Sequence, residues 1–494
     1  MSDPRFFAAA DLGASSGRVI LGELADGVMR LREVARWENG PTDRATDALR
    51  WDTPHLFDEV AAGFRAAYEA SGGRLESVAV DTWGVDYGRI GHDGELLELP
   101  FHYRDSRTDG AIEKVFGLVP ASELYAEAGL QVQPFNTIFQ LAAQADDERW
   151  GEVDTILLTP DLLGYWLSGR RYAEVTIAST TGLLDPAARR WSASITDALR
   201  EKLGLPLPRV LPELVEPGTV VGTTRPGLLP GEVAVVAVGA HDTASAVVTV
   251  PAEVEDFAFI SSGTWSLVGL ELLAPVLSTA SEAANFTNEL GVDGTTRFLK
   301  NVMGLWVLIE CRRAWTEESG EKLGWGELVE LAAQEEPLAA VIDMEDERLL
   351  PPGDMVARVR ALAAEAGQEL GEGKGAVVRC ILDSLALSYR RAIREACRVA
   401  DRAVSVVHVV GGGSANTLLC QLTADATGLP VGAGPTEGTA LGNLLVQARA
   451  MGALSGSLTD LRAVSRASSE LRTYRPGALG IDPAAWDAAE ARLG

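Results

Sequence analysis

Basic residues are scarce in this chain. Its 494 residues include 43 Lys and Arg against 70 Asp and Glu, which gives a formal net charge of −27 at pH 7. A chain this acidic repels phosphate backbones and anionic membrane surfaces. We therefore expect neither a nucleic acid nor a membrane among its partners.

Cysteine and histidine are also few, and neither is clustered. The four cysteines show no C-x-x-C spacing, and the five histidines are scattered along the chain. A disulfide framework or a zinc site would need these residues at short, repeated spacings. The sequence favours neither, and we interpret the thiols as buried core groups: Cys311, Cys380, Cys397 and Cys420.

Long hydrophobic segments are absent as well. No run of 18 or more apolar residues occurs, and the opening MSDPRFFAAADLG has one Arg and only a short apolar segment before Asp11. This layout is unlike a membrane span or a secretory signal. We expect a cytoplasmic protein, and the sequence leaves its oligomeric state open between a monomer and a dimer.

Strand-like and helix-like patterns alternate along the chain. Hydrophobic residues make up 47% of it, enough for two large domains or three average ones, each with its own core. Apolar strands such as SVVHVVGGG lead into helix-like runs such as ANTLLCQLTADATG. In the run 376–402, Val377, Ile381, Leu382 and Leu385 share one helix face. The pattern predicts an α/β fold.

Two segments share one layout, which indicates an internally duplicated architecture. Residues 6–24 and 256–272 each read as an apolar strand, a small turn with Ser and Gly, and a second apolar strand. Gly in such a turn lets main-chain N–H groups point at an anion. A plain β-hairpin is the alternative for either segment alone. The hinge between the halves is expected in the acidic stretch 248–256, which contains Pro251.

Other Gly-rich segments differ from the common nucleotide motifs. GEGKGA is not a P-loop, because Gly375 follows Lys374 where Ser or Thr should stand. VVGGGSANTLL has Asn416 in place of the third Gly of a dinucleotide fingerprint. Alone it could be a cofactor loop or a tight turn. Beside two anion-binding hairpins it fits a wall against adenosine.

Asp11 and Asp242 are the candidate catalytic carboxylates. Asp11 ends the first strand just before GASSGR, where it could hold a hydrated Mg²⁺ near phosphates. Asp242 follows the strand-like run 233–238 and precedes small residues, which would place it at the N-terminus of a helix. From there its carboxylate could accept a proton from a hydroxyl. His241 would then orient substrate. The alternative is that Asp11 caps its own turn and Asp242 caps a helix.

Aromatic residues stand in or beside the polar motifs, as in DTWGVDYG and SGTWSLVG. Rings pack against the C–H face of a sugar while amides and carboxylates bind its hydroxyls. Core packing is the alternative for each ring taken singly. The residues concerned are Trp83, Tyr87, Phe135, Trp265 and Trp306.

Taken together, the motifs closely resemble those of the rhamnulokinase family in the FGGY group of carbohydrate kinases. The match runs in order from about residue 7 to 443 and includes DLGASSGR, DTWGVD, YRDSRT, PFNTIFQL, HDTASAV, SSGTWSLVG, FTNE, KNVMGLW, DSLALSY and GTALGN. The resemblance implies an actin-like ATPase fold, with two ribonuclease-H-type domains around a central cleft. It also implies ATP- and Mg²⁺-dependent phosphorylation of L-rhamnulose at its 1-hydroxyl.

The resemblance also implies a division of the chain and a set of site residues. An N-terminal FGGY-type domain spans 1–247, a C-terminal one spans 248–454, and surface helices fill 455–494. The implied general base is Asp242, with Gly84, His241, Thr243 and Asn301 in the sugar site. The implied ATP contacts are Ala14, Ser15, Ser16, Gly17, Arg18, Thr264 and Gly412.

One position departs from the family pattern. After GLW, relatives often carry a Gln that approaches the nucleotide, whereas this chain has Ile309. One ATP contact is therefore in doubt. Two alternatives stay open: a kinase for another ketose such as L-fuculose or L-xylulose, and a non-catalytic, nucleotide-gated binding protein.

Overall fold

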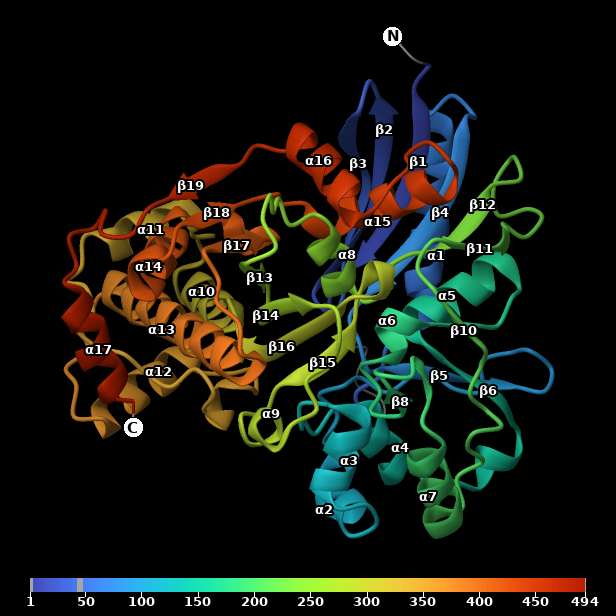
Figure 1. Ribbon diagram of the computed structural model, residues 1–494, viewed down its shortest axis with the longest axis horizontal. Coiled ribbons are helices and arrows are strands. Elements are labelled where there is room, and N and C mark those ends of the chain that lie inside the picture. The colour runs from blue at the N-terminus through green and yellow to red at the C-terminus, as the bar shows by residue number, and fades with distance from the viewer. Residues whose placement is uncertain (1–2, 42–47, 494) are drawn as a thin grey trace. The chain divides into compact units, whose positions relative to one another are not determined.

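The computed structural model describes residues 3–41 and 48–493 (Figure 1). The chain divides into two units, each built from separate segments. The first comprises Met1–Thr249, Leu272–Phe298 and Gly438–Ser468, and the second comprises Val250–Glu271, Leu299–Glu437 and Ser469–Gly494. The domain boundaries that we drew from the sequence remain a prediction.

The first unit is organised around a six-stranded sheet with the order β11-β12-β4-β1-β2-β3. β1 pairs antiparallel with β2 and parallel with β4, and β12 pairs parallel with β4. Its strands are β1 (Arg5–Leu12), β2 (Ser16–Ala25), β3 (Val28–Glu38), β4 (Leu75–Thr82), β11 (Thr219–Thr223) and β12 (Ala234–Ala237).

Six strands of a second, seven-stranded sheet repeat this arrangement, and the seventh strand, β15 (Thr287–Leu290), lies at its edge beside β16. In the order β16-β14-β13-β17-β18-β19, β13 pairs antiparallel with β14 and parallel with β17, as β1 does with β2 and β4. The duplication predicted from the two hairpins is confirmed. The strands are β13 (Phe257–Ser262), β14 (Trp265–Leu272), β16 (Thr296–Met303), β17 (Val406–Val410), β18 (Val431–Ala433) and β19 (Arg472–Tyr474).

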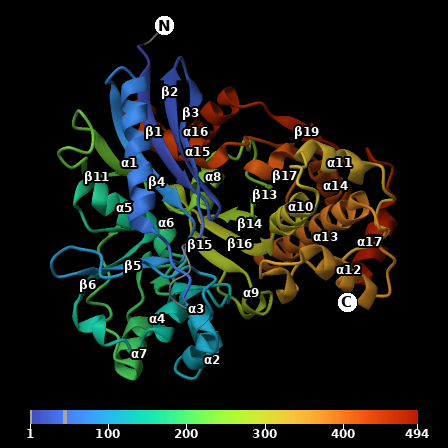
Figure 2. The same cartoon turned by 180° about the vertical axis from the view of Figure 1, so that it is seen from behind.

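Both faces of the first sheet are covered, because successive side chains of β1 point to opposite sides. On one face, β1 packs against α1 (Thr53–Ala70) and α5 (Thr159–Ser168) in a core cluster that contains Phe6, Ala8, Ala10, Leu12, Leu56, Val60, Phe64, Leu163 and Leu167. On the other face, β1 packs against α8 (Asp242–Val248) and α15 (Gly438–Ala450) in a cluster that contains Phe7, Ala9, Val248, Ala440, Leu441 and Leu444. Figure 1 shows α15 and α16 on the near face of β1–β4, and Figure 2 shows α1 on the opposite face.

The helices of the first unit connect its strands and include two returning from the end of the chain. They are α1 (Thr53–Ala70), α2 (Ala111–Phe116), α3 (Ala121–Ala128), α4 (Thr137–Ala143), α5 (Thr159–Ser168), α6 (Val175–Ala178), α7 (Ala193–Leu203), α8 (Asp242–Val248), α9 (Thr279–Ala283), α15 (Gly438–Ala450) and α16 (Leu458–Ser468). Its shorter strands are β5 (Tyr87–Gly91), β6 (Val153–Leu158), β7 (Ala173–Glu174), β8 (Leu184–Asp185), β9 (Arg190–Trp191), β10 (Leu214–Val215) and β15 (Thr287–Leu290).

The long helix predicted over 376–402 is α13 (Lys374–Ala400), orange in Figure 1. All four residues of its predicted apolar face are fully buried, and α13 packs against α11 and α14. The other helices of the second unit are α10 (Trp306–Ser319), α11 (Trp325–Ala333), α12 (Met355–Glu365), α14 (Thr417–Thr427) and α17 (Pro483–Ala491). The last residues thus include strand β19 as well as helices.

The structure shows the surroundings of the four cysteines and the character of the helices. Cys311, Cys380 and Cys420 are buried free thiols and Cys397 is partly exposed, so the core interpretation is confirmed for three of the four. Along the described chain no helix combines the length and apolar character needed to cross a bilayer.

Candidate active site

Three carboxylates come together at one end of the first sheet. Asp11 in β1 lies opposite Asp81 in β4 in the parallel register. The N–H of Thr82, the last residue of β4, donates to the carbonyl of Ala240 at 2.9 Å, and α8 begins two residues later with Asp242. Asp11 and Asp242 both act electrostatically on Asp81. Segments far apart in sequence therefore form one acidic site.

Asp11 is engaged by the hairpin that follows it. Its Oδ2 accepts from Nε and Nη2 of Arg18, at 3.0 and 2.7 Å. The β1–β2 hairpin closes with the N–H of Gly13 donating to the carbonyl of Ser16 at 2.9 Å. The predicted metal residue and a predicted ATP residue are therefore an ion pair, and Asp11 contacts Arg18 in preference to its own turn.

Asp81 was missed as a site residue, although it stands in the motif DTWGVD. Its side chain is fully buried, Oδ2 accepts from Nδ2 of Asn443 at 2.6 Å, and within the described part of the chain Oδ1 has no hydrogen-bond partner. Burial, with the charge of Asp11, raises the pKa of this carboxyl well above its ordinary value.

Asp242 is the first residue of α8, as the small residues after it predicted. Its Oδ1 accepts from the backbone N–H and, at 3.0 Å, from the hydroxyl of Thr243. The side chain is 31% exposed. Burial raises the pKa of Asp242 above its ordinary value, and the charge of His241 opposes the increase. With the donors on Oδ1, Oδ2 is the oxygen open to a ligand.

The backbone before Asp242 is held by side chains that sequence reasoning missed. The N–H of Ala240 donates to Oε2 of Glu174 at 3.1 Å, and the N–H of His241 donates to Oγ1 of Thr176 at 3.3 Å. Burial raises the pKa of Glu174 to about 7 even though Thr176, Ile177 and Ala240 donate to it. The loop that presents Asp242 is thus rigidly attached to α6.

Gly84 stands at a crowded, strained turn after β4. A Cβ at this position would lie 3.0 Å from Oγ1 of Thr180, and the next residue, Val85, has φ of 71°. A β-branched residue in the left-handed region is strained, and such strain concentrates at functional sites. The N–H of Val85 donates to the same Oγ1 at 3.2 Å. The structure thus places Gly84 against Thr180 and two residues after Thr82, which bridges to His241.

An aromatic cluster surrounds Asp86. Its carboxylate accepts from Nε1 of Trp51 at 2.6 Å, Nε1 of Trp83 at 3.0 Å and Nε2 of Gln140 at 2.9 Å. The ring centroids of Trp51 lie 4.1 Å from Trp83 and 4.2 Å from His102. Trp83 and Tyr87 are buried, which supports the core alternative for these two rings. The motif contained Asp86, but nothing in it showed that indoles would meet there.

The buried carboxyl of Asp86 should make stability depend on pH. Burial raises its pKa from 3.8 to about 6, so its contribution is full below pH 4 and is lost as pH rises to 6. Asp86→Asn removes this loss, and we expect the variant to gain up to about 3 kcal/mol relative to wild type between pH 4 and 7. Urea unfolding of both proteins across this range measures it; a constant difference would contradict it.

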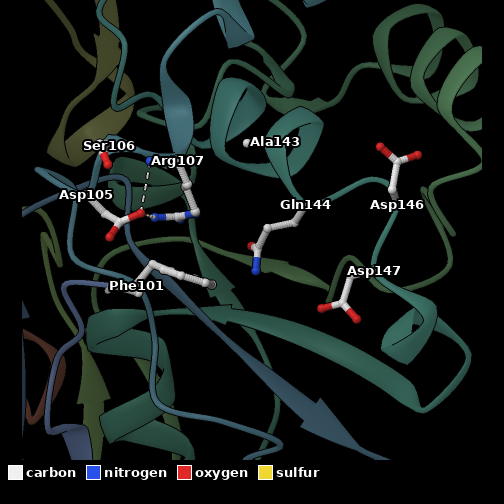
Figure 3. A pocket seen from close by; sticks show the side chains of 9 residues that line it. Phe101, Asp105, Ser106, Arg107, Ala143, Gln144, Asp146 and Asp147 are labelled. Carbon is white, nitrogen blue, oxygen red and sulfur yellow. Dashed lines mark hydrogen bonds and ion pairs between the residues drawn. The ribbon is translucent and has the colours of Figure 1, made fainter. Parts of the chain in front are cut away.

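A pocket of about 450 Å³ lies beside this cluster in the first unit. Figure 3 shows Arg107 next to Asp105 on one side and Asp146 and Asp147 on the other. Arg107 donates to Oε1 of Gln140 at 2.6 Å, and its guanidinium carbon lies 3.8 Å from the ring centroid of Phe101. None of the predicted site residues lines this pocket.

The second unit carries the other predicted residues. Thr264 lies in the β13–β14 turn, and its carbonyl accepts from the N–H of Trp306 at 3.1 Å. Gly412 begins a 3₁₀ turn after β17. This turn packs tightly against β13, since a Cβ on Gly413 would lie 1.9 Å from Oγ of Ser262. Asn301 is in β16 and Ile309 is in α10.

Comparison with known proteins identifies this architecture. The model of the FGGY family of carbohydrate kinases, N-terminal domain, matches residues 6–249, and that of the C-terminal domain matches residues 258–451. The chain belongs to the FGGY family of carbohydrate kinases. It is therefore an enzyme of the carbohydrate kinase class, and ATP is its co-substrate.

Two curated relatives of this FGGY kinase are similar over nearly their whole lengths. A rhamnulokinase of Bacteroides thetaiotaomicron is 40% identical over 494 residues, covering 98% of this chain and 97% of the relative. A rhamnulokinase of Enterococcus faecalis is 39% identical over 459 residues, covering 92% and 90%. The family prediction from the motifs is confirmed.

Solved structures give the same fold for this FGGY kinase. A gluconate kinase of Lactobacillus acidophilus superposes with a TM-score of 0.77 at 14% identity, covering 99% of this chain and 96% of the other. A xylulose kinase of Rhodospirillum rubrum gives 0.76 at 18% identity, covering 99% and 97%. With the two equivalent sheets, this confirms the predicted α/β, actin-like fold.

Proposed function

We propose that this FGGY kinase phosphorylates L-rhamnulose at its 1-hydroxyl, with ATP as donor, and releases L-rhamnulose 1-phosphate and ADP in L-rhamnose breakdown. The full-length similarity to proteins named rhamnulokinase supports this substrate. The observation that carries the chemistry is the carboxylate of Asp242, whose Oδ1 holds the donors from Thr243 while the side chain remains 31% exposed.

Asp242 is the proposed general base. Its raised pKa brings it closer to the pH at which the enzyme works, which favours proton transfer, and its place at the start of α8 favours the ionised form before reaction. Oδ2 would accept the proton of the 1-hydroxyl as the oxygen attacks the γ-phosphorus. Gly84, His241, Thr243 and Asn301 are proposed to contact the sugar.

The proposed phosphate contacts are the two hairpin turns. In the first, Ala14 to Arg18 present main-chain N–H groups and the guanidinium of Arg18. In the second unit, Thr264 is the corresponding turn residue and Gly412 is the proposed neighbour of the nucleoside. Small residues at these positions let the backbone approach a phosphate closely. Relatives often carry a Gln at position 309 that approaches the nucleotide. Ile309 in α10 has no polar side-chain group and would not make that contact.

The acidic site is suited to Mg²⁺. In the described residues no group of three or more His, Cys, Asp or Glu side chains is arranged to hold a metal, so an ion at this site would take most of its ligands from phosphate oxygens and water. Asp11 would hold it through its waters, and Oδ1 of Asp81, buried without a partner, faces no competing donor. When bound, Mg²⁺ neutralises charge on the phosphates.

A substrate panel tests the proposal. ADP release, measured with a coupled enzyme assay, should give kcat/KM for L-rhamnulose at least about tenfold above that for L-fuculose, L-xylulose and glycerol, since a hydrogen bond to one hydroxyl is worth about 0.5–1.5 kcal/mol and about 1.4 kcal/mol is tenfold. A higher value for another ketose would move the assignment to that sugar. ADP release unaffected by any sugar would favour a nucleotide-gated binding protein.

The location and the oligomeric state of the enzyme can also be proposed. We propose that the enzyme works in the cytoplasm, because its co-substrate ATP is regenerated there, and that it is a monomer or a dimer. Light scattering of the purified chain, together with its calculated mass of 52.4 kDa, decides the second point.

A further inference from the structure

A buried ion pair lies against the imidazole of His241. Oε2 of Glu289 is 3.1 Å from Nδ1 of His241 and 3.0 Å from Nη1 of Arg297. The side chains of Arg297, Glu289 and His241 are 0%, 5% and 9% exposed. All three belong to the first unit. None of the proposed catalytic roles uses Glu289 or Arg297.

Burial of such a pair needs a reason, since the desolvation cost of two buried charges can exceed their attraction. The pair is formed locally, with Glu289 on β15 and Arg297 on β16, and the guanidinium also donates to the carbonyl of Leu290 at 3.1 and 3.2 Å. Burial alone would raise the pKa of Glu289, but Arg297 and His241 outweigh it and lower the pKa. Glu289 therefore stays ionised.

The two nitrogens of His241 face different partners. Nδ1 meets the pair, with Nη1 and Nη2 of Arg297 at 3.3 and 3.2 Å, whereas Nε2 lies 3.5 Å from Oδ1 of Asp242. The backbone of this loop is held independently by Glu174 and Thr176. Glu289 and Arg297 thus contact the ring of His241, whereas other side chains contact its backbone.

We propose that Glu289 and Arg297 are positioning residues for Asp242, acting through the ring of His241. This inference rests on the proposed role of Asp242 as the base. With Nε2 of His241 held 3.5 Å from Oδ1 and Thr243 donating to that oxygen, Oδ2 is the oxygen left for the sugar hydroxyl. The charge of the His241 ring that this pair holds beside Asp242 lowers the pKa of Asp242.

Several other charged groups act on the same carboxylate, and their presence limits the size of the effect. Asp11 raises the pKa of Asp242, and Asp11 and Asp242 both raise the pKa of Asp81. The groups that surround the His241–Asp242 segment are Asp11 of β1, Arg18 of β2, Asp81 of β4, Glu174 of β7, Glu289 of β15 and Arg297 of β16.

Glu289→Gln in the full chain tests the proposal, because it removes the charge and keeps the shape. We expect kcat to fall about tenfold, from a misplaced base, with KM for ATP changed less than about twofold. The acid limb of the kcat–pH profile should move to higher pH by about half a unit or more, since a His241 ring no longer held beside Asp242 lowers the pKa of Asp242 less. Glu310→Gln, which breaks the ion pair with Arg313 in the second unit, is the matched control.

Two further measurements separate positioning from a structural role. In a His241→Asn background, Glu289→Gln should cause no additional shift of the acid limb, because the ring that transmits it is gone. In ¹⁵N-histidine-labelled protein, Glu289→Gln should change the ring nitrogen shifts of His241, which are assigned by their loss in His241→Asn. This second readout does not depend on turnover.

The outcomes are distinguishable. An unchanged acid limb in Glu289→Gln, or an equal shift with and without His241, would overturn the positioning role. If Glu289→Gln does not fold, His241→Asn alone must still shift the acid limb upward, and a fixed limb would overturn the proposal. Full turnover of Asp242→Asn would instead reject the base itself and with it the proposed mechanism.

Discussion

Asp242→Asn should lower kcat by about 10² to 10⁴-fold, which corresponds to roughly 3–5 kcal/mol of transition-state stabilisation. The amide keeps the shape of the carboxylate and can still accept from Thr243 through one oxygen. It cannot take a proton from the attacking hydroxyl. Steady-state kinetics with L-rhamnulose and ATP measure the loss.

The effect should appear in kcat much more than in the KM for ATP, because the lost interaction is made only as the proton moves. Asp293→Asn is a suitable control, since it makes the same substitution in the first unit and breaks only the ion pair with Arg449. Turnover of Asp242→Asn close to that of this control would remove Asp242 from the mechanism.

Gly442→Ala should be strongly destabilising, because the added methyl group would meet backbone atoms of a neighbouring helix. Gly442 lies in α15 where this helix crosses α8, and an ideal Cβ would stand 1.8 Å from the carbonyl oxygen of Ser245 and 2.7 Å from its carbon. Backbone atoms cannot rotate away, so the helices must separate. We expect a loss of about 3 kcal/mol or more in the free energy of unfolding.

Activity should fall with it, because Ser245 and Asp242 are on the same short helix. Gly326→Ala provides the control of opposite sign: Gly326 is also inside a helix, α11, but no atom lies within 4 Å of its Cβ position. That variant should be stabilised by up to about 1 kcal/mol. Thermal and urea unfolding compare the two, and equal stability of both variants would contradict the close helix contact.

Much of the fold could be predicted because its signals are local. The two hairpins, the alternation of strands and helices and the apolar face of α13 depend on residues near one another in sequence. Asp242 at the start of α8 follows from small residues after a strand. The cysteines could be interpreted only as a group, and the exposure of Cys397 depends on how far the surface of α13 is covered.

The candidate site was less predictable for a different reason. Asp81, Asp86, Glu289 and Asn443 all stand inside motifs that the sequence displayed, yet each has at least one partner that is distant along the chain. Nδ2 of Asn443 reaches Asp81 across 362 positions, and Nε1 of Trp51 reaches Asp86 across 35. A motif shows which chemical groups are available and does not show which of them meet.

The sequence by itself determined the family, the duplicated strand pattern and the candidate base, since periodicity, glycine turns and helix starts are encoded within a few residues. The tertiary structure decided which side chains adjust that base. It set the ion pair of Asp11 with Arg18, the burial that raises the pKa of Asp81 and the contact of Glu289 with His241. These depend on burial and distance, and both are established only when separate strands pack into one sheet.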